Sequence, residues 1–450
     1  MRIAVIGSGI AGLSAAWLLN GRHDVTLYEA EARLGGHANT VTVDCNGTTT
    51  AVDTGFIVYN ERTYPNLVQL FRHLDVATEP SDMSFGVSID GGRLEYEGSL
   101  RGLLAQPGNL ASPRYLRMIA DVLRFFSGAT RLLDEPGPGP TLGEWLARER
   151  YGRGFIDDHL LPMGAAIWSC PVETMLAFPA KSFIRFFDNH QLLNLRERPQ
   201  WRTVTGGSRR YVARLAATLT GRIRLDCPVL RVAPTATGVW VAAADGSVET
   251  YDQVVLATHA DRALRLIDGP TPAEADVLGR FRYQPNTAIL HGDTSLMPRR
   301  RGAWAAWNYQ AERAGPAEDG TAGHGPADRR VALTYWMNRL QNLDPARPLF
   351  VSMNPLREPD PAAVFARVAY DHPVFDTAAI EAQAMLPSIQ GGRRLWFCGS
   401  YCGWGFHEDG LKAAIAVAGA LGVSPPWPCD VPPARSEPAS PDYRLADAAD

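Results

Sequence analysis

The stretch Arg2-Ile3-Ala4-Val5-Ile6-Gly7-Ser8-Gly9-Ile10-Ala11-Gly12 opens this chain and decides its fold. A short apolar run ends in a glycine turn, and small and apolar residues follow up to Leu19, which predicts a strand, a tight loop and a helix. The Gly-x-Gly-x-x-Gly spacing lets the backbone approach a pyrophosphate, whose charge then lies at the positive end of the helix. Val25–Glu29 adds a second strand, so residues 2–29 predict a β-α-β unit that binds a dinucleotide.

The residues after the second strand indicate which dinucleotide binds. Glu29 follows Gly7 by 22 residues, where a carboxylate accepts hydrogen bonds from the adenosine ribose and would repel the 2′-phosphate of NADP. Arg33-Leu34-Gly35-Gly36-His37 comes next: its glycine pair permits a close backbone approach, and its arginine can neutralise a phosphate. NAD dehydrogenases have no standard requirement for such an extension, so this stretch favours FAD.

This arrangement resembles the superfamily of flavin-containing amine oxidases, carotenoid desaturases and protoporphyrinogen oxidases, whose pattern is Glu, three residues, Arg, one residue and Gly-Gly. The resemblance recurs at 52–56, 205–215, 227–229, 252–257 and 397–411, in the order typical of the family. It implies an FAD that accepts a hydride at N5, and we expect this FAD to be bound non-covalently. The cofactor-binding residues implied are Gly7, Gly9, Ile10, Ala11, Gly12, Glu29, Ala30, Arg33, Gly35, Gly36, His37, Thr54, Gly55, Phe56, Val229, Ala257, Gly399, Ser400, Gly410 and Leu411.

Two positions depart from the family pattern. His37 stands where a second arginine is common, and Ser400 follows Gly399 where an acidic residue is usual. A hydroxyl or a water molecule would then replace the carboxylate contact to the ribityl chain or phosphate. Amine oxidases of the family often hold a water near flavin N5 with a lysine, but this chain contains only Lys181 and Lys412. The sequence therefore does not favour that amine oxidase arrangement.

The order of strand and helix patterns predicts an α/β protein with two domains. Nucleotide-binding segments near the start, middle and end indicate a Rossmann-type FAD-binding domain assembled from discontinuous pieces. Its expected segments are residues 1–75, 205–275 and 390–423. Residues 76–204, which read as mainly helical, and 276–389 would form an α+β substrate domain with a mixed sheet and helices. Residues 311–328 predict a mobile loop, and 424–450 predict an extended or disordered tail.

Composition narrows the classes of partner. The net charge of −4 at pH 7 argues against a polyanion-binding chain, so we expect no nucleic-acid partner. The six cysteines and ten histidines show no ligand-type spacing, so we expect no metal. No signal-peptide pattern precedes the first strand, and no apolar run approaches the roughly 20 residues of a membrane helix. These features predict a cytoplasmic protein.

Residues 113–133 predict an amphipathic helix that bears on the substrate. Ser112 can cap this helix, and Pro113 suits its first position. Arg114, Arg117 and Arg124 share one face. Apolar and aromatic side chains line another face: Tyr115, Leu116, Ile119, Val122, Leu123, Phe125 and Phe126. Such a helix can lie in a membrane interface, here peripherally on the inner face, and the alternative is a surface helix packed on its own domain.

A closer resemblance points to a lipid substrate. Residues 33–39, 54–66, 160–170 and 399–410 resemble a bacterial subgroup of FAD/NAD-binding, amine-oxidase-like proteins often encoded beside cyclopropane-fatty-acid-synthase-like methyltransferases. This association implies a fatty-acyl or phospholipid substrate. We expect an enzyme of the desaturase or oxidase type that dehydrogenates a hydrophobic substrate, with oxygen or a quinone as electron acceptor. Amine oxidation, double-bond isomerisation without net oxidation and a non-enzymatic partner subunit stay open as alternatives.

The candidate catalytic residues are side chains expected near the flavin ring. By the resemblance, the loop Trp404-Gly405-Phe406-His407 lies beside the ring, which makes His407 and Glu408 the nearest ionisable groups. Tyr309 comes from the aromatic cluster at 304–309. An acid–base role for these three is a hypothesis, because the flavin itself is the main reactive group in such enzymes.

Overall fold

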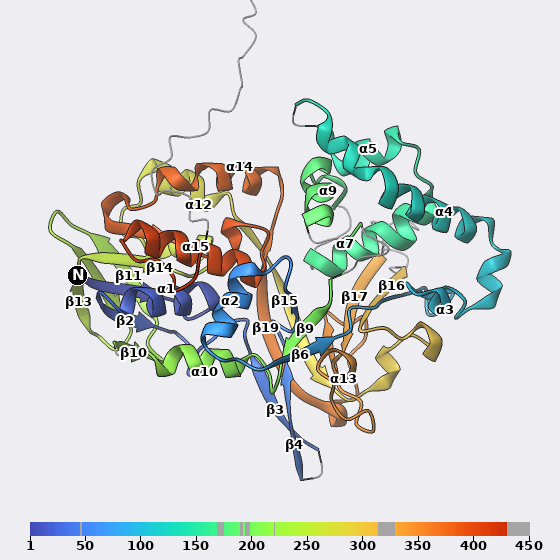
Figure 1. Ribbon diagram of the computed structural model, residues 1–450, viewed down its shortest axis with the longest axis horizontal. Helices are drawn as coiled ribbons and strands as arrows, with labels where there is room; N and C mark the ends of the chain where they lie inside the picture. Colours follow the sequence, from blue (N-terminus) through green and yellow to red (C-terminus); the bar gives the residue numbers. More distant parts are fainter. Residues whose placement is uncertain are drawn as a thin grey trace, which may run out of the picture.

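Two halves, each organised around a sheet, make up the molecule (Figure 1). The half that contains the N-terminus holds a five-stranded sheet, and the other half holds a seven-stranded sheet beside a group of helices. The computed structural model describes residues 1–45, 47–137, 139–168, 175–189, 192–193, 199–219, 221–313 and 329–429.

A parallel sheet in the order β10-β2-β1-β14-β20 forms the centre of the first half. Its strands are β1 (Arg2–Ile6), β2 (Asp24–Tyr28), β10 (Arg222–Arg224), β14 (Gln253–Leu256) and β20 (Leu395–Phe397). The central strands are continuous apolar runs because both faces of a parallel sheet are buried. The strands come from the start, middle and end of the chain, so the predicted α/β fold with a discontinuous Rossmann-type sheet is confirmed.

Helices and three small sheets complete this half. The helices are α1 (Ile10–Asn20), α2 (Pro65–His73), α10 (Arg209–Ala217), α11 (Ala260–Leu266), α12 (Pro272–Gly279), α14 (Thr377–Met385) and α15 (His407–Ala420). The first small sheet pairs β3 (Thr40–Cys45) with β4 (Thr48–Asp53). The second contains β5 (Tyr59–Asn60), β9 (Trp201–Val204) and β6 (Thr78–Ser81). The third contains β11 (Val229–Pro234), β12 (Val239–Ala243) and β13 (Val248–Tyr251). Helix α1 packs directly against α15, which brings the two ends of the described chain together.

The second half is built on a mixed sheet in the order β19-β15-β18-β17-β16-β7-β8. The pair β16–β7 is parallel and the other pairs are antiparallel. The strands are β7 (Phe85–Ile89), β8 (Leu94–Glu97), β15 (Arg282–His291), β16 (Trp307–Arg313), β17 (Arg329–Trp336), β18 (Phe350–Met353) and β19 (Val364–Val374). This arrangement matches the mixed sheet expected from the sequence.

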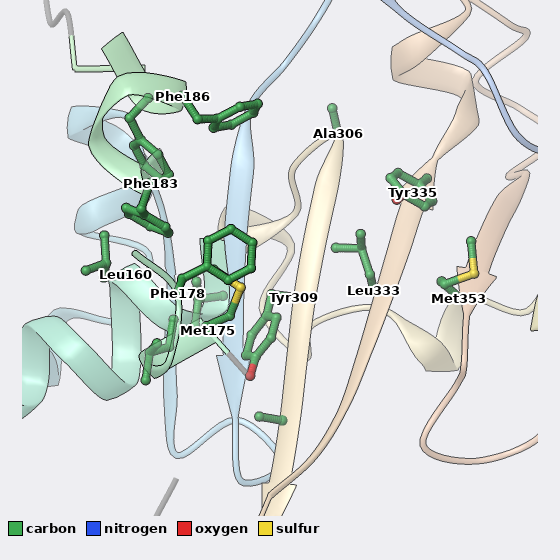
Figure 2. Packing of buried hydrophobic residues seen from close by; sticks show 14 of the residues in the cluster. Leu160, Met175, Phe178, Phe183, Phe186, Ala306, Tyr309, Leu333, Tyr335 and Met353 are labelled. Atoms are coloured by element: carbon green, nitrogen blue, oxygen red, sulfur yellow. The ribbon is translucent and has the colours of Figure 1, made fainter. Parts of the chain in front are cut away.

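A layer of helices covers part of this sheet. The helices of this half are α3 (Leu100–Leu103), α4 (Pro113–Gly128), α5 (Leu142–Arg148), α6 (Arg153–Phe155), α7 (Leu161–Trp168), α9 (Ala180–Asn189) and α13 (Met337–Leu340). Figure 2 shows Phe178 and Met175 from the helical side facing Tyr309 of β16. These large side chains form part of the core between the helices and the sheet.

Three predictions about this organisation require correction. The segment 76–204 is not mainly helical at its start, because β6, β7 and β8 lie between residues 78 and 97. The turn Asp90-Gly91-Gly92, whose three φ angles are positive, joins β7 and β8 in a hairpin. Residues 311–313 of the expected loop continue β16, whereas 314–328 lie outside the described residues. The expected tail begins as packed chain: Trp427 is buried and stacks on Trp17, while 430–450 lie outside the described residues.

None of the helices in the described ranges is both long enough and apolar enough to cross a membrane. Helix α4 begins where the sequence predicts, with the Ser112 hydroxyl accepting a hydrogen bond from the Tyr115 amide at 3.4 Å. It ends at Gly128, and a 3-10 turn continues the segment to Asp134.

Candidate active site

The candidate active site begins where three parallel strands end. Gly7 follows β1, Ala257 follows β14, and Gly399 lies just beyond β20. Because these strands run in the same direction, the three residues meet at the edge where open α/β sheets bind nucleotides. All three line a cavity of about 1240 Å³ that extends from this edge to the helices of the second half.

The glycines of the first motif leave room for a pyrophosphate. Gly7 has a φ of 99°, and a Cβ at Gly12 would lie 1.8 Å from the Gly7 carbonyl oxygen. A Cβ at Gly9 would meet no described atom within 4 Å, and this residue faces the cavity with Ile10 and Ala11. No side chain in the described residues caps the N-terminus of α1, so its first amides are available to phosphate oxygens. These residues fit the pyrophosphate of FAD.

Glu29 supplies the acidic group that a ribose needs. Its carboxylate lines the cavity and accepts hydrogen bonds from the Ser8 amide at 2.9 Å and the Ser8 hydroxyl at 2.5 Å. The other carboxylate oxygen accepts a hydrogen bond from the Glu31 amide at 2.9 Å. These contacts fix the orientation of the carboxylate, and its remaining lone pairs can accept from ribose hydroxyls.

The Arg33–Gly36 loop closes over the glycine motif. The Arg33 guanidinium donates to the Gly36 carbonyl at 2.9 Å and pairs with Glu31 at 3.0 Å. Gly35 and Gly36 have φ angles of 112° and 54°, and a Cβ at Gly36 would lie 3.2 Å from the Gly9 Cα. Both Arg33 and Gly36 line the cavity, so the arginine is placed where it can neutralise phosphate charge.

Three histidines gather beside this loop. His37 stacks on Tyr370 with ring centroids 4.6 Å apart, and His259 and His372 lie 6.2 and 5.4 Å from His37. Burial lowers the pKa of His37 well below its ordinary value, and the neighbouring histidines lower it further. Burial also lowers the pKa of His372 to about 4. The cluster is neutral at neutral pH, so His37 replaces the family's second arginine without its charge.

The opposite end of the cofactor cradle lies at the N-terminus of α15. Phe56 stacks on His407 with ring centroids 3.7 Å apart, and a hydrogen bond of 3.0 Å joins the Tyr211 hydroxyl to His407 Nε2. Gly55, Phe56, Ser400 and His407 line the cavity. Burial lowers the pKa of His407 to about 3, so its imidazole is a neutral group that can position a ligand but carries no cationic charge.

Asp53, which the sequence analysis did not single out as a site residue, joins three segments behind the cavity. Its carboxylate accepts hydrogen bonds from the Thr40 hydroxyl at 2.5 Å, the Ser208 amide and hydroxyl at 2.9 and 2.7 Å, and the Gln341 side chain at 2.9 Å. Burial raises the pKa of Asp53 to about 6, although these hydrogen bonds oppose the shift. The residue therefore fixes the Gly206-Gly207 turn against both halves of the molecule.

Several predicted cofactor residues lie outside the cavity lining: Gly12, Ala30, Gly35, Thr54, Val229, Gly410 and Leu411. Gly410 lets α15 approach α1, because a Cβ there would lie 2.8 Å from the Ile10 side chain. The Thr54 hydroxyl hydrogen-bonds with the Tyr370 hydroxyl at 2.9 Å. Val229 is buried in β11 and pairs with Ala243. Gly410 and Thr54 thus support the cradle through their contacts with α1 and Tyr370.

Of the three predicted catalytic residues, His407 alone lines the cavity within the described chain. The Glu408 carboxylate accepts hydrogen bonds from the Asn66 amide and side chain at 3.1 and 2.8 Å, and from the Leu67 amide at 2.9 Å. Tyr309 is buried in the core beside the helical layer (Figure 2). The structure thus places both side chains away from the described lining: Glu408 binds the N-terminus of α2, and Tyr309 packs in the core.

Away from the cradle, the cavity continues as an apolar arm into the second half. The apolar arm is lined by Met83, Phe85, Met118, Ile119, Val122, Leu123, Phe126, Met163, Ile167, Phe186, Leu192, Trp307 and Tyr335. Neither lysine lies in the described lining: Lys181 donates to the Gly137 carbonyl at 2.8 Å, and Lys412 lies 4.0 Å from Glu408. The arm therefore suits an apolar chain better than a charged group.

Polar side chains also line this part of the cavity: Ser81, Ser84, Tyr96, Glu97, Ser99, His159 and Gln200, none of which the sequence analysis singled out. The Tyr96 hydroxyl donates to the Asp158 carbonyl at 2.7 Å and lies 3.1 Å from His159 Nδ1, and both rings line the cavity. His159 sits on the π-helical turn Ile156–Leu160, a rare conformation that often marks functional sites. The Asp90-Gly91-Gly92 turn could have revealed the strand that carries Tyr96, but no local signal predicts the π-helical turn.

The sheet edge, the glycine motif and the acidic residue after β2 define a dinucleotide-binding protein of the flavoprotein type. The family model for flavin containing amine oxidoreductases matches residues 10–292, and the chain belongs to this family. The family is one of flavin-containing oxidoreductases, which implies FAD as the cofactor that the cradle would hold.

Two sequence relatives are similar to parts of the chain. The chain is 27% identical over 283 residues to a protein named as flavin-containing monoamine oxidase AofH of Mycobacterium tuberculosis, with 60% of each chain covered. A segment of 40 residues, 9% of this chain and 8% of the relative, is 58% identical to the L-amino-acid oxidase of Pseudechis australis. The chain thus spans about three-fifths of the first relative's length and less than a tenth of the second's.

Solved structures show the same fold over nearly the whole chain. A protein described as a protoporphyrinogen oxidase from Exiguobacterium sp. 255-15 has a TM-score of 0.63 and 16% identity, covering 93% of this chain and 98% of that one. Putrescine oxidase bound to putrescine gives 0.64 and 14%, with 94% and 99% covered. The CLA-producing fatty acid isomerase from P. acnes gives 0.61 and 15%, with 94% and 98% covered. At these identities the likeness establishes the fold alone.

Proposed function

We propose that this protein dehydrogenates a hydrophobic substrate of the fatty-acyl or phospholipid class at a carbon–carbon bond. One observation carries the proposal: a single cavity joins the FAD cradle to an arm lined by aliphatic and aromatic side chains. An acyl chain in this arm would replace water along its length, and each buried methylene would contribute about 0.8 kcal/mol. The substrate would lose a hydride and a proton from neighbouring carbons, and oxygen or a quinone would take up the electron pair.

FAD, when bound, supplies the hydride-accepting group. The chain's own residues would orient the substrate and exclude water. Phe56 and His407 stack where α15 meets the cavity, and the side chains of the apolar arm would keep water from the reacting carbon atoms. Polar side chains for the other end of such a substrate also line this part of the cavity, among them Ser84, Tyr96 and His159. This division suits a substrate with a long apolar part and one polar end.

Amine oxidation is the second candidate, because the printed name of the first relative is that of a monoamine oxidase. Two features of the site count against it. The described lining contains no lysine, and its part in the second half consists largely of aliphatic and aromatic side chains. A fatty acid isomerase among the structural neighbours motivates the third candidate, a double-bond shift without net oxidation.

Anaerobic incubation of the FAD-loaded protein separates these candidates. Loss of the visible flavin absorbance with an unsaturated or methyl-branched phospholipid, but not with alkylamines, is expected. Bleaching by amines alone would contradict the proposal. A rearranged lipid without flavin bleaching or oxygen uptake would indicate isomerisation. Mass spectrometry of lipids from cells with and without the protein then identifies the product, which should be lighter by two hydrogen atoms.

A further inference from the structure

Exposed leucines gather on one edge of the second half. The large apolar side chains that stay exposed between residues 100 and 123 are Leu100, Leu104, Leu110, Leu116 and Leu123. They belong to α3, α4 and the chain between these helices, which lie together at the end of the molecule far from the N-terminus (Figure 1). We refer to these five residues as the leucine rim. A soluble surface rarely collects so many exposed leucines without a ligand or a partner.

The leucine rim is continuous with the apolar arm. Leu100 and Leu123 are exposed and also line the cavity, so the arm opens at this edge. On α4, Ile119, Val122 and Phe126 face the cavity, Leu123 lies at its mouth and is also exposed, and Leu116, seven residues before Leu123, faces outward. A ligand that enters the arm here therefore passes over exposed apolar surface.

The arginines of α4 are each paired with an acid of the same half of the molecule. Arg114 pairs with Asp158 at 2.7 Å, and Arg117 and Arg124 each bind Asp121 at 3.0 Å. Arg124 also donates to the Glu149 carbonyl at 2.8 Å. These contacts tie α4 to its own domain, as the alternative interpretation of this helix expected.

Arginines outnumber acids among the charges without an ion-pair partner beside α3. Arg101 and Arg301 are exposed, and Gly302 lies against Ala105, so Arg301 is near the end of α3; neither arginine forms an ion pair in the described part of the chain, and Glu97 is an acid beside them that forms none either. Asp121 and Asp158, the acids that α4 contacts, are buried beneath their arginines. Leucines flanked by unpaired arginines complement a surface with an anionic outer layer and an apolar interior.

We propose that the leucine rim docks on an anionic phospholipid bilayer, so that the apolar arm opens directly to the lipid. The substrate class in this inference rests on the proposed function, but the docking itself does not require turnover. The docking surface consists of the leucines of α3 and α4, with Arg101 beside them, instead of the paired arginines of α4. The protein is therefore peripheral: it contacts one leaflet through side chains that are already exposed.

Vesicle flotation tests the docking without any enzymatic assay. The FAD-loaded protein is mixed with vesicles of phosphatidylcholine alone or with phosphatidylglycerol added. We expect flotation with the anionic vesicles, and a reduction of at least about tenfold in the bound fraction for Leu104→Ser combined with Leu116→Ser. Neither residue lines the cavity, so turnover of detergent-dispersed substrate stays unchanged. Arg101→Glu should weaken binding to anionic vesicles more than to neutral ones.

The matched control is Leu225→Ser combined with Leu230→Ser, on the FAD-binding half. These leucines are 40% and 62% exposed, against 53% and 49% for Leu104 and Leu116. Equal loss of flotation in the two double variants overturns the proposal, and so does a wild-type protein that never floats. A rim variant that converts a dimer to a monomer, with flotation unchanged, assigns the surface to a second copy instead. Flotation without lipid-dependent flavin bleaching would refute the proposed function and leave the docking intact.

Discussion

The two ends of the cavity are built in different ways. The FAD cradle is formed by backbone atoms at strand ends, by glycines whose Cβ atoms would collide, and by one oriented carboxylate. The apolar arm is formed by side chains from segments far apart in the sequence, and no backbone turn defines it. The phosphates and ribose hydroxyls of a dinucleotide need hydrogen-bonding groups at defined positions, so few backbone arrangements can bind it. An apolar chain can be accommodated by many combinations of apolar side chains. The cradle therefore identifies the family, and the arm carries the proposal about the substrate.

Gly12→Ala should cause the largest change of all the variants, a loss of FAD affinity at the cradle. The new Cβ would lie 1.8 Å from the Gly7 carbonyl oxygen, so α1 must move away from β1 and from the pyrophosphate. We expect FAD affinity to fall about 1000-fold, equivalent to about 4 kcal/mol, measured by fluorescence titration of the apoprotein. Gly21→Ala, one residue beyond the same helix, meets no described atom within 4 Å and should bind FAD normally. Equal affinity in both variants would contradict the close approach.

Asp53 couples the two halves behind the cradle, and its effect depends on pH. The pKa of Asp53 is raised from 3.8 to about 6, so the folded protein binds this proton more tightly than the unfolded chain does. Its contribution to stability is complete below about pH 4 and is lost as the pH rises to about 6, a change of about 3 kcal/mol. The free energy of unfolding is measured in urea at about pH 4 and about pH 7. In Asp53→Asn it should not show this fall of about 3 kcal/mol between the two pH values. An identical decline in wild type and variant would show that Asp53 does not titrate in this range.

Ile119→Asp should act on the arm and spare the cradle. The carboxylate would face apolar side chains, and binding of an acyl chain would weaken about 30-fold, or about 2 kcal/mol, which appears as a higher KM. The visible spectrum and affinity of FAD should stay unchanged. Ala120→Asp, the next residue on α4, is exposed and should behave as wild type with detergent-dispersed substrate. A loss of FAD from the Ile119 variant would mean that the two ends are not independent.

Sequence reasoning reached the cradle because its chemistry is local. Gly7, Glu29 and Arg33 lie within one β-α-β unit and its extension, and their spacing alone places them at the sheet edge. The arm could not be predicted in the same way. His159 reaches it from a π-helical turn and Tyr96 from a hairpin, and only tertiary packing brings the two side chains together. Tyr309 could not be placed from the sequence for the same reason, because an aromatic side chain fits both a cavity wall and the core, where the structure has it.

Glu408→Gln should have the smallest effect and should separate support of the cradle from catalysis. The carboxylate holds the first amides of α2, so its replacement by an amide should lower the free energy of unfolding by about 1–2 kcal/mol. The kcat and the flavin spectrum should stay close to those of the wild type, because the side chain does not line the cavity. Lys412→Gln removes only an exposed partner 4.0 Å from the same carboxylate and should change stability by less than about 0.5 kcal/mol. A large fall in kcat for Glu408→Gln, with unchanged stability, would return this residue to the reacting end of the cavity.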